Sequence, residues 1–362
     1  MLVRIRFIAV AAAFALAGAF VPPAAAQTVV THKYDPYFDH MVDLSRAFGL
    51  EMLTIRLTVA EAFPAPIPKD LVPQLNRMAT KDMGRFLGTL QQKDARLASE
   101  LKASIDAVVA TLNAGTSPAA AAARAKPIVA EAYKVVVDPA LQANLQFKTA
   151  NLANILVAED GVAEAFEEAG KPTGPWQFPI GWAAYGRAKA LWADVNKAAT
   201  PDQRADGDLM IEVIAPFYAS IVPRSPFPAE DAEEVEAHVH HLVTVLEGVV
   251  DAHLYVGRDM PRLTQYLADL LAPACTDYAA GQNALATERV YAVLDQFVSE
   301  ASGLSGVVSV LAPDLEQKAQ RAFPRLVITR YQTTGVDMAT PAANACRDLH
   351  AVLTETKGLV AG

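Results

Sequence analysis

A stretch of the C-terminal half carries the side chains best suited to metal chemistry. Residues 229–256 contain four of the seven histidines of the chain, with several carboxylates between them. Glu234, His238 and His241 are spaced i, i+4 and i+7, so on a helix they fall within about 60° of one another. Imidazole and carboxylate together suit Zn, Fe or Cu. We therefore predict a divalent-metal site at these three residues.

Such a site needs a further ligand, and a simpler interpretation fits the same helix. The further ligand would come from another helix, for example near His40, where Asp35, Asp39 and Asp43 recur every four residues. Glutamates in a first turn also stabilise a helix through its dipole, whether or not they bind a metal. The H-E-x-x-H motif of zinc proteases is absent. Clustered histidines without a known motif thus also fit a solvated helix face.

A second cluster is aromatic. All three tryptophans, Trp176, Trp182 and Trp192, lie within 17 residues, with Tyr185 between them. On a helix that begins near Pro179, Trp182, Tyr185 and Trp192 would share a face. Flat aromatic surfaces with a polar edge can hold a sugar ring or an apolar ligand, so these residues are the predicted platform of a ligand carrier. Core packing at a domain junction explains the same stripe, and both interpretations stay open.

Catalytic motifs are scarce. The chain has no G-x-S-x-G elbow, phosphate-binding loop or dinucleotide fingerprint. Neighbouring carboxylates, such as Glu159 with Asp160 or Glu164 with Glu167, could act as acid and base on a glycoside. Glutamate is common on exposed helices, however, so spacing alone does not separate a catalyst from a solvated face. An all-α carbohydrate-active enzyme is the third hypothesis, and we assign it no catalytic residue.

The N-terminus is typical of an exported protein. Residues 1–6 carry two positive charges, residues 7–20 are uncharged and apolar, and residues 24–26 are alanines. A charged region, a short apolar region and a small-residue cleavage site form the pattern of a secretory signal peptide, here residues 1–26. The apolar region is shorter than the roughly 20 residues that span a bilayer. We expect a soluble periplasmic protein with no membrane span after the signal.

The charge of the chain excludes nucleic acid as a partner. The formal net charge is −9, and removal of Arg4 and Arg6 with the signal makes the mature chain still more acidic. An acidic surface repels the phosphates of nucleic acid and of anionic lipids.

The two cysteines, Cys275 and Cys346, predict one disulfide. An even pair in an oxidising compartment favours a bridge, and the chain has no Cys-x-x-Cys redox motif. We expect this bridge to be structural.

The apolar periodicity predicts an all-α protein, a multi-helix bundle. Apolar residues recur near every 3.6 positions, and runs of alternating β-branched residues are nearly missing. The Pro-rich segment 221–228 predicts a boundary between an N-terminal helical subdomain, 27–222, and a C-terminal one, 229–362. The expected helices are 35–62, 69–92, 94–114, 117–136, 139–169, 179–198, 201–219, 229–256, 260–279, 282–312, 313–330 and 340–357.

These observations favour an exported periplasmic binding or accessory protein for a small ligand or a metal ion, with Zn or Fe as the metals considered first. A carrier of an apolar or sugar ligand is the first alternative, and the carbohydrate-active enzyme is the second. Partner proteins and oligomeric state cannot be read from the sequence.

Overall fold

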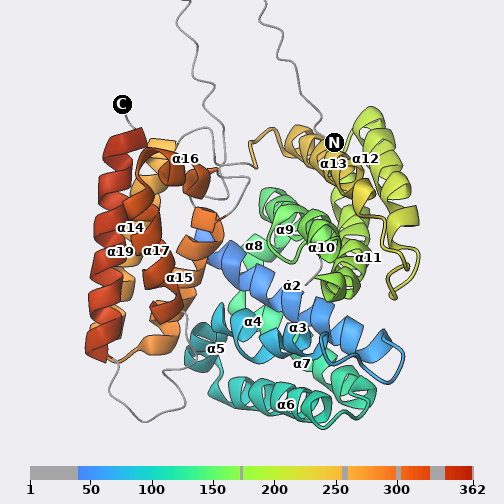
Figure 1. The fold of residues 1–362 in the computed structure, drawn as a ribbon, viewed down its shortest axis with the longest axis horizontal. Coiled ribbons are helices and arrows are strands. Elements are labelled where there is room, and N and C mark those ends of the chain that lie inside the picture. The colour runs from blue at the N-terminus through green and yellow to red at the C-terminus, as the bar shows by residue number, and fades with distance from the viewer. Residues whose placement is uncertain (1–39, 172–173, 255–259, 299–302, 327–338, 361–362) are drawn as a thin grey trace, which may run out of the picture. The chain divides into compact units, whose positions relative to one another are not determined.

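The computed structural model is built from α-helices and short 3-10 helices, which confirms the predicted all-α multi-helix bundle (Figure 1). It describes residues 40–171, 174–254, 260–298, 303–326 and 339–360, and these ranges contain no β-strand. The described residues all belong to one unit. The predicted signal peptide, 1–26, lies outside the described residues, as do Asp35 and Asp39.

The helices of the first part run from α2 to α13. The α-helices are α2 (Met41–Ala62), α3 (Val72–Asn76), α4 (Lys81–Gly84), α5 (Leu87–Lys93), α6 (Ala95–Asn113), α7 (Ala119–Val136), α8 (Pro139–Ala143), α9 (Leu145–Val157), α10 (Val162–Ala169), α11 (Phe178–Val195), α12 (Pro201–Ile214) and α13 (Ala232–Val250). The 3-10 helices are η1 (Arg77–Ala79), η2 (Pro175–Gln177), η3 (Asn196–Ala198), η4 (Ala215–Tyr218) and η5 (Ala229–Asp231).

The helices of the second part are α14 (Met260–Ala279), α15 (Asn283–Val298), α16 (Leu304–Leu311), α17 (Pro313–Leu326) and α19 (Ala339–Val360). Helix α14 packs against α15 and α19, and α17 packs against α19. Cys275 on α14 and Cys346 on α19 form the predicted disulfide, with Cα atoms 5.3 Å apart. The bridge therefore joins two helices that already pack side by side.

Helix α2 is the element around which the others assemble. It packs against α4, α7, α9, α11 and α15, and Figure 1 shows it crossing the middle of the view. Most of its residues are buried, on every side of the helix. A helix that is apolar all round is a core helix. Its buried charged residues, Glu51 and Arg56, are therefore exceptions that need partners inside the protein.

Helix α13 packs against α9, α10 and α12. The predicted boundary at 221–228 thus separates α12 from α13 along the chain, although the two helices lie against each other. The division into subdomains 27–222 and 229–362 stays a prediction.

Some predicted helix ends are confirmed and others are wrong. The predicted helix 201–219 begins at Pro201 as α12, where Thr200 forms a capping box with Gln203. The predicted helix 229–256 ends earlier, at Val250, because Asp251 adopts a left-handed conformation with φ 49°. The predicted helix 282–312 is divided into α15 and α16, and Gly303 with φ 65° begins the second of them.

The predicted helix 139–169 is three helices. The side chain of Asn144 accepts a hydrogen bond from the backbone N–H of Phe147 and so caps α9. Asp160 lies in the turn between α9 and α10 and adopts a left-handed conformation with φ 67°. At Gly161 a Cβ would lie only 2.6 Å from the carbonyl oxygen of Ala158, so this tight turn requires glycine.

We expect the disulfide to contribute much of the stability of the second part of the fold. Cys275 and Cys346 are 71 residues apart, and closing a loop of that length stabilises a protein by about 4 kcal/mol in the chain-entropy model. The variant Cys275→Ser/Cys346→Ser should therefore unfold at a lower urea concentration than the oxidised wild type. Reduced wild type is the matched control and should resemble the variant. Equal midpoints for all three would contradict this role.

Candidate functional site

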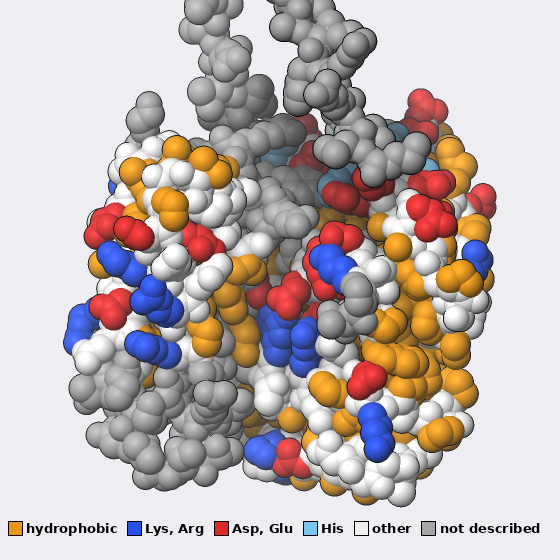
Figure 2. Space-filling model, viewed as in Figure 1, with side chains coloured by type: hydrophobic (Ala, Val, Ile, Leu, Met, Phe, Trp, Pro, Cys, Tyr) orange, Lys and Arg blue, Asp and Glu red, His pale blue; other side chains and the backbone are white. Residues whose placement is uncertain are grey.

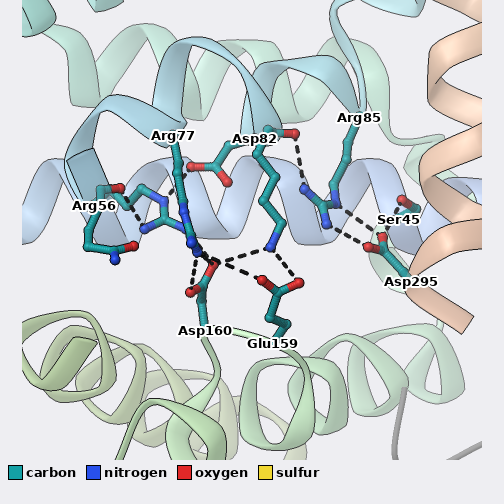
Figure 3. A network of polar contacts seen from close by, with 10 residues as sticks. Ser45, Arg56, Arg77, Asp82, Arg85, Glu159, Asp160 and Asp295 are labelled. Carbon is teal, nitrogen blue, oxygen red and sulfur yellow. Dashed lines mark hydrogen bonds and ion pairs between the residues drawn. The ribbon is translucent and has the colours of Figure 1, made fainter. Parts of the chain in front are cut away.

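A buried guanidinium joins three segments of the first part of the fold. Arg56 of α2 has no exposed surface. Its Nε donates to Asp82 Oδ2 at 2.8 Å, and its Nη2 donates to Asp160 Oδ2 at 2.7 Å. Its Nη1 donates to the backbone carbonyl of Gln74 at 2.9 Å. Figure 3 shows Arg56 among these partners, so α2 is tied at one point to α3, to α4 and to the turn before α10.

Asp160 is the carboxylate at which most of these cations meet. Arg77 Nη1 lies 2.8 Å from its Oδ1, and Lys81 Nζ lies 3.4 Å from its Oδ2. Burial opposes ionisation of this group, but the charges of Arg56, Lys81 and Arg77 together outweigh burial and hold the pKa of Asp160 well below its usual range. Asp160 is therefore an ionised anion with all its nearby cations engaged. We call Arg56, Arg77, Lys81, Asp82 and Asp160 the Arg56 network.

Arg85 extends the network to α15. It is buried, and its Nη2 and Nε donate to the two carboxylate oxygens of Asp295 at 2.6 and 3.1 Å. Its Cζ lies 4.7 Å from the ring centroid of Tyr291 and 5.4 Å from that of Phe48, within range of a cation–π interaction. At Gly49 of α2 a Cβ would lie 2.8 Å from Arg85 Cβ, so glycine allows α4 to approach α2 this closely.

A second buried carboxylate of α15 binds the same region. Glu288 accepts hydrogen bonds from the backbone N–H of Thr89 at 2.6 Å and from its hydroxyl at 2.7 Å. Arg46 Nε donates to it at 3.0 Å. Burial raises the pKa of Glu288, and Arg46 lowers it only in part. Helix α15 is thus attached to α2, α4 and α5 through charged and polar contacts in addition to apolar packing.

An open pocket of about 310 Å³ lies beside the Arg56 network. Four acids and one cation line it together with a small residue and an amide; they are Arg77, Glu159, Asp160, Glu164, Ala165, Glu168 and Gln177. Lys81 and Arg77 both form ion pairs with Glu159 as well as with Asp160. Figure 2 shows acidic and basic side chains side by side in the hollow near the middle of this face. We call this the acid-lined pocket.

Gln177 is the least satisfied polar group of the acid-lined pocket. Only 8% of the residue is exposed, and its Oε1 is buried without a hydrogen-bond partner in the protein. A buried acceptor without a donor costs about 1–3 kcal/mol. The pocket therefore combines excess carboxylate with an unused amide oxygen, and both features favour a ligand that donates hydrogen bonds.

The predicted metal residues lie on the exposed side of α13. His238 Nε2 lies 3.5 Å from Glu234 Oε1, one turn away, so the predicted spacing does bring these two groups together. His241 is exposed. Across the described ranges, no group of three or more His, Cys, Asp or Glu side chains is placed to hold a metal ion. The metal site stays a prediction, without a third ligand in this part of the chain.

The aromatic cluster divides into buried and half-buried members. Trp192 is 2% exposed and donates from Nε1 to Asp208, and a Cβ at Gly207 would lie 2.2 Å from its ring. Tyr185 is buried and donates to the carbonyl of Ile211. Trp176 and Trp182 are half-buried and pack against the core. Trp192 and Tyr185 therefore contribute to packing between α11 and α12, while the platform prediction rests on Trp176 and Trp182.

The carboxylates considered for acid–base catalysis have different positions. Glu159, Asp160 and Glu164 line the acid-lined pocket, whereas Glu167 forms an ion pair with Lys171. Asp160 is ionised and bound by three cations, so it is not a proton donor. The sequence pattern thus identified three acids that line the pocket, although it assigned them to acid–base catalysis.

The cations of the network were not among the predicted site residues. One signal was present in the sequence. Residues 52–60 are apolar except for two threonines and one charged residue, Arg56. A charged residue inside a buried helix requires a buried partner. Its partners, Asp82 and Asp160, lie 26 and 104 residues away, and the sequence does not identify them.

Comparison with known protein families, with curated proteins and with solved structures gives no match for this chain. The site therefore has to be interpreted from its own geometry. In the described part of the chain, no helix has the length and apolar character needed to cross a membrane.

We expect the charge of Asp160 to hold the network together. Asp160→Asn keeps the shape of the side chain and tolerates positive φ, but leaves Arg56 buried with one carboxylate fewer. Removing one partner of a buried ion pair costs about 3–5 kcal/mol, so the free energy of unfolding at neutral pH should fall by this amount. Exposed Asp106, in an ion pair with Lys102, provides the control Asp106→Asn, which should change little.

The same comparison has a defined pH dependence. Because the folded pKa of Asp160 lies below the value of 3.8 for the free group, its contribution is complete above that value and is lost as the pH falls toward the folded pKa. The difference between wild type and Asp160→Asn should thus be larger at pH 7 than at about pH 3 in urea titrations. A difference that is constant with pH would show that Asp160 does not act through its charge.

Proposed function

We propose that this chain is an exported periplasmic binding protein whose ligand is a small, positively charged amine. The acid-lined pocket is the proposed binding site. The secretory pattern of residues 1–26 supports export, and it is independent of the site. The observation that carries the ligand class is the excess of acceptors in the pocket, where four acids and the unpartnered Gln177 Oε1 face a single lining cation.

The cations beside the pocket are already paired with carboxylates. Arg77 and Lys81 are bound by Glu159 and Asp160, and Arg56 by Asp82 and Asp160. The further carboxylates of the lining are Glu164 and Glu168, one turn apart on α10, and Lys171 pairs with Glu168. Carboxylates at this spacing are neighbours on a helix surface, so two ammonium groups of one small molecule could bind both.

The rigid base of the pocket favours binding over catalysis. A ligand gains affinity when the site is already in its bound shape, because less ordering is needed on binding. The Arg56 network fixes the turn that carries Glu159 and Asp160, directly before α10. Acid–base catalysis instead requires a carboxyl group whose pKa lies near the working pH. Asp160 has the opposite property.

The proposal is tested by titrating the mature protein with 1,4-diaminobutane in a calorimeter, with 1,4-butanediol as the uncharged analogue. We expect binding of the diamine but not of the diol, and an affinity loss of about tenfold or more in Glu164→Gln, since a charge-assisted hydrogen bond contributes about 1.5–3 kcal/mol. The exposed glutamate of the Glu131–Lys134 pair on α7 gives the control Glu131→Gln, which should bind normally. No binding of the diamine, or equal affinity in both variants, would contradict the proposal.

Zinc chloride in the same assay tests the metal prediction separately. The contact between His238 and Glu234 favours this second candidate. Zinc binding that is lost in His238→Ala/His241→Ala, but retained in Glu164→Gln, would identify metal handling as the function.

A further inference from the structure

A second groove lies between α17 and α19, outside the Arg56 network and the acid-lined pocket. Its volume is about 380 Å³. Lys318, Arg321 and Arg325 of α17 line one side, and Asp348 and Glu355 of α19 line the other. Figure 2 shows basic and acidic side chains interspersed over these two helices. We call it the α17–α19 groove.

The two rows of charge follow from helical spacing. Lys318, Arg321 and Arg325 are spaced i, i+3 and i+7 on α17, so they share one face. Asp348 and Glu355 are spaced i and i+7 on α19, which also places them on one face. With a rise of 1.5 Å per residue, each row is about 10 Å long. A row of cations therefore faces a row of anions of equal length.

These opposite charges do not neutralise one another. Helices α17 and α19 pack together, yet Lys318, Arg325, Asp348 and Glu355 form no hydrogen bond or ion pair with the described residues. In the described part of the chain, Arg321 donates to Gln317 on its own helix. All five charged side chains are exposed. The cations and anions of the groove are thus too far apart to contact one another, and both are accessible to a ligand.

The surface between the rows is small and apolar. Ala322 of α17 and Ala345, Ala351 and Val352 of α19 line the groove between the charges. Small side chains there leave the space that the groove occupies, and they offer an apolar contact to whatever fills it. A ligand that matches all three features has an anionic end, a cationic end and a small apolar body.

We propose that the α17–α19 groove binds a small zwitterion of the amino-acid or short-peptide class. Its carboxylate would bind the cations of α17, where an arginine can hold a carboxylate through two parallel hydrogen bonds. Its ammonium group would bind Asp348 and Glu355. A ligand with negative charge alone would be repelled by the acids of α19, and a polyamine would be repelled by the three cations of α17. The zwitterion satisfies both rows at once.

The test uses the mature protein and three forms of one dipeptide: alanylalanine, its N-acetyl derivative and its C-terminal amide. Each is titrated by calorimetry. We expect alanylalanine to bind about tenfold or more tightly than either blocked form, because each blocked form loses one charged contact of the type that contributes about 1.5–3 kcal/mol.

Two variants separate the two ends of the ligand. In Asp348→Asn/Glu355→Gln, acetylation of the dipeptide should no longer weaken binding, while amidation still should. In Lys318→Gln/Arg321→Gln/Arg325→Gln, which removes all three cations of α17, the reverse is expected. Because all five side chains are exposed, the variants should retain the wild-type circular dichroism and unfolding midpoint. Lys102→Gln/Asp106→Asn, at an exposed ion pair on α6, is the matched control and should behave as wild type.

The proposal is overturned if the free and blocked dipeptides bind equally, or if none binds. It is also overturned if each charge variant loses both the preference over the acetylated dipeptide and the preference over the amidated one. That result would mean that the cations and the anions of the groove do not bind opposite ends of the ligand. Dipeptide binding should be unaffected by Glu164→Gln, so that this groove and the acid-lined pocket are tested independently.

Discussion

The fold depends on how the positive charge of Arg56 is accommodated inside a buried helix. Moving an ion out of water costs several kcal/mol even after the protein relaxes, and the cost is recovered only when partners are close and well oriented. Arg56 meets this condition with two carboxylates and a carbonyl group, all within 2.9 Å. Those partners come from α3, α4 and the turn before α10, so the folded chain has to bring all of these segments to α2.

This requirement connects the core to the candidate site. Asp160 must reach Arg56 from a turn that ends α9, and it does so with a positive φ that few residue types adopt readily. The turn then starts α10, whose Glu164 and Glu168 line the acid-lined pocket. Apolar residues of similar volume would often stabilise such a core equally well, so the particular contribution of the ionic contacts is to fix the position of the turn relative to α2. The pocket is the feature that benefits from this fixed position.

The parts of the structure that sequence patterns predicted are those set by local periodicity. The all-α fold, the start of α12 at Pro201 and the pairing of Cys275 with Cys346 follow from spacing, a local helix-start signal or a simple count. The prediction of one helix over 139–169 misses the turn at Asp160-Gly161, although this dipeptide is typical of turns. The ion pair of Asp160 with Arg56, 104 residues earlier, adds a tertiary contact at the turn that the sequence does not identify.

The predictions of functional sites were also limited to what local spacing can show. Helical spacing correctly brought Glu234 to His238, but spacing on one helix says nothing about which other helix supplies a third ligand. The aromatic stripe on α11 was recognised, yet the structure was needed to show that Trp192 lies against Gly207 of α12. Glu159, Asp160 and Glu164 were noted as neighbouring acids, whereas the cations that define their chemistry come from η1 and α4.

The most direct test of the account is a double-mutant cycle between Arg56 and Asp160, measured as the free energy of unfolding in urea. The variants are Arg56→Met, Asp160→Asn and the combination. Each single variant leaves a buried charge without one partner, so the combined loss should be smaller than the sum of the single losses by about 1 kcal/mol or more. Losses that add to within about 0.5 kcal/mol would show that the two residues do not act on each other and would contradict the account.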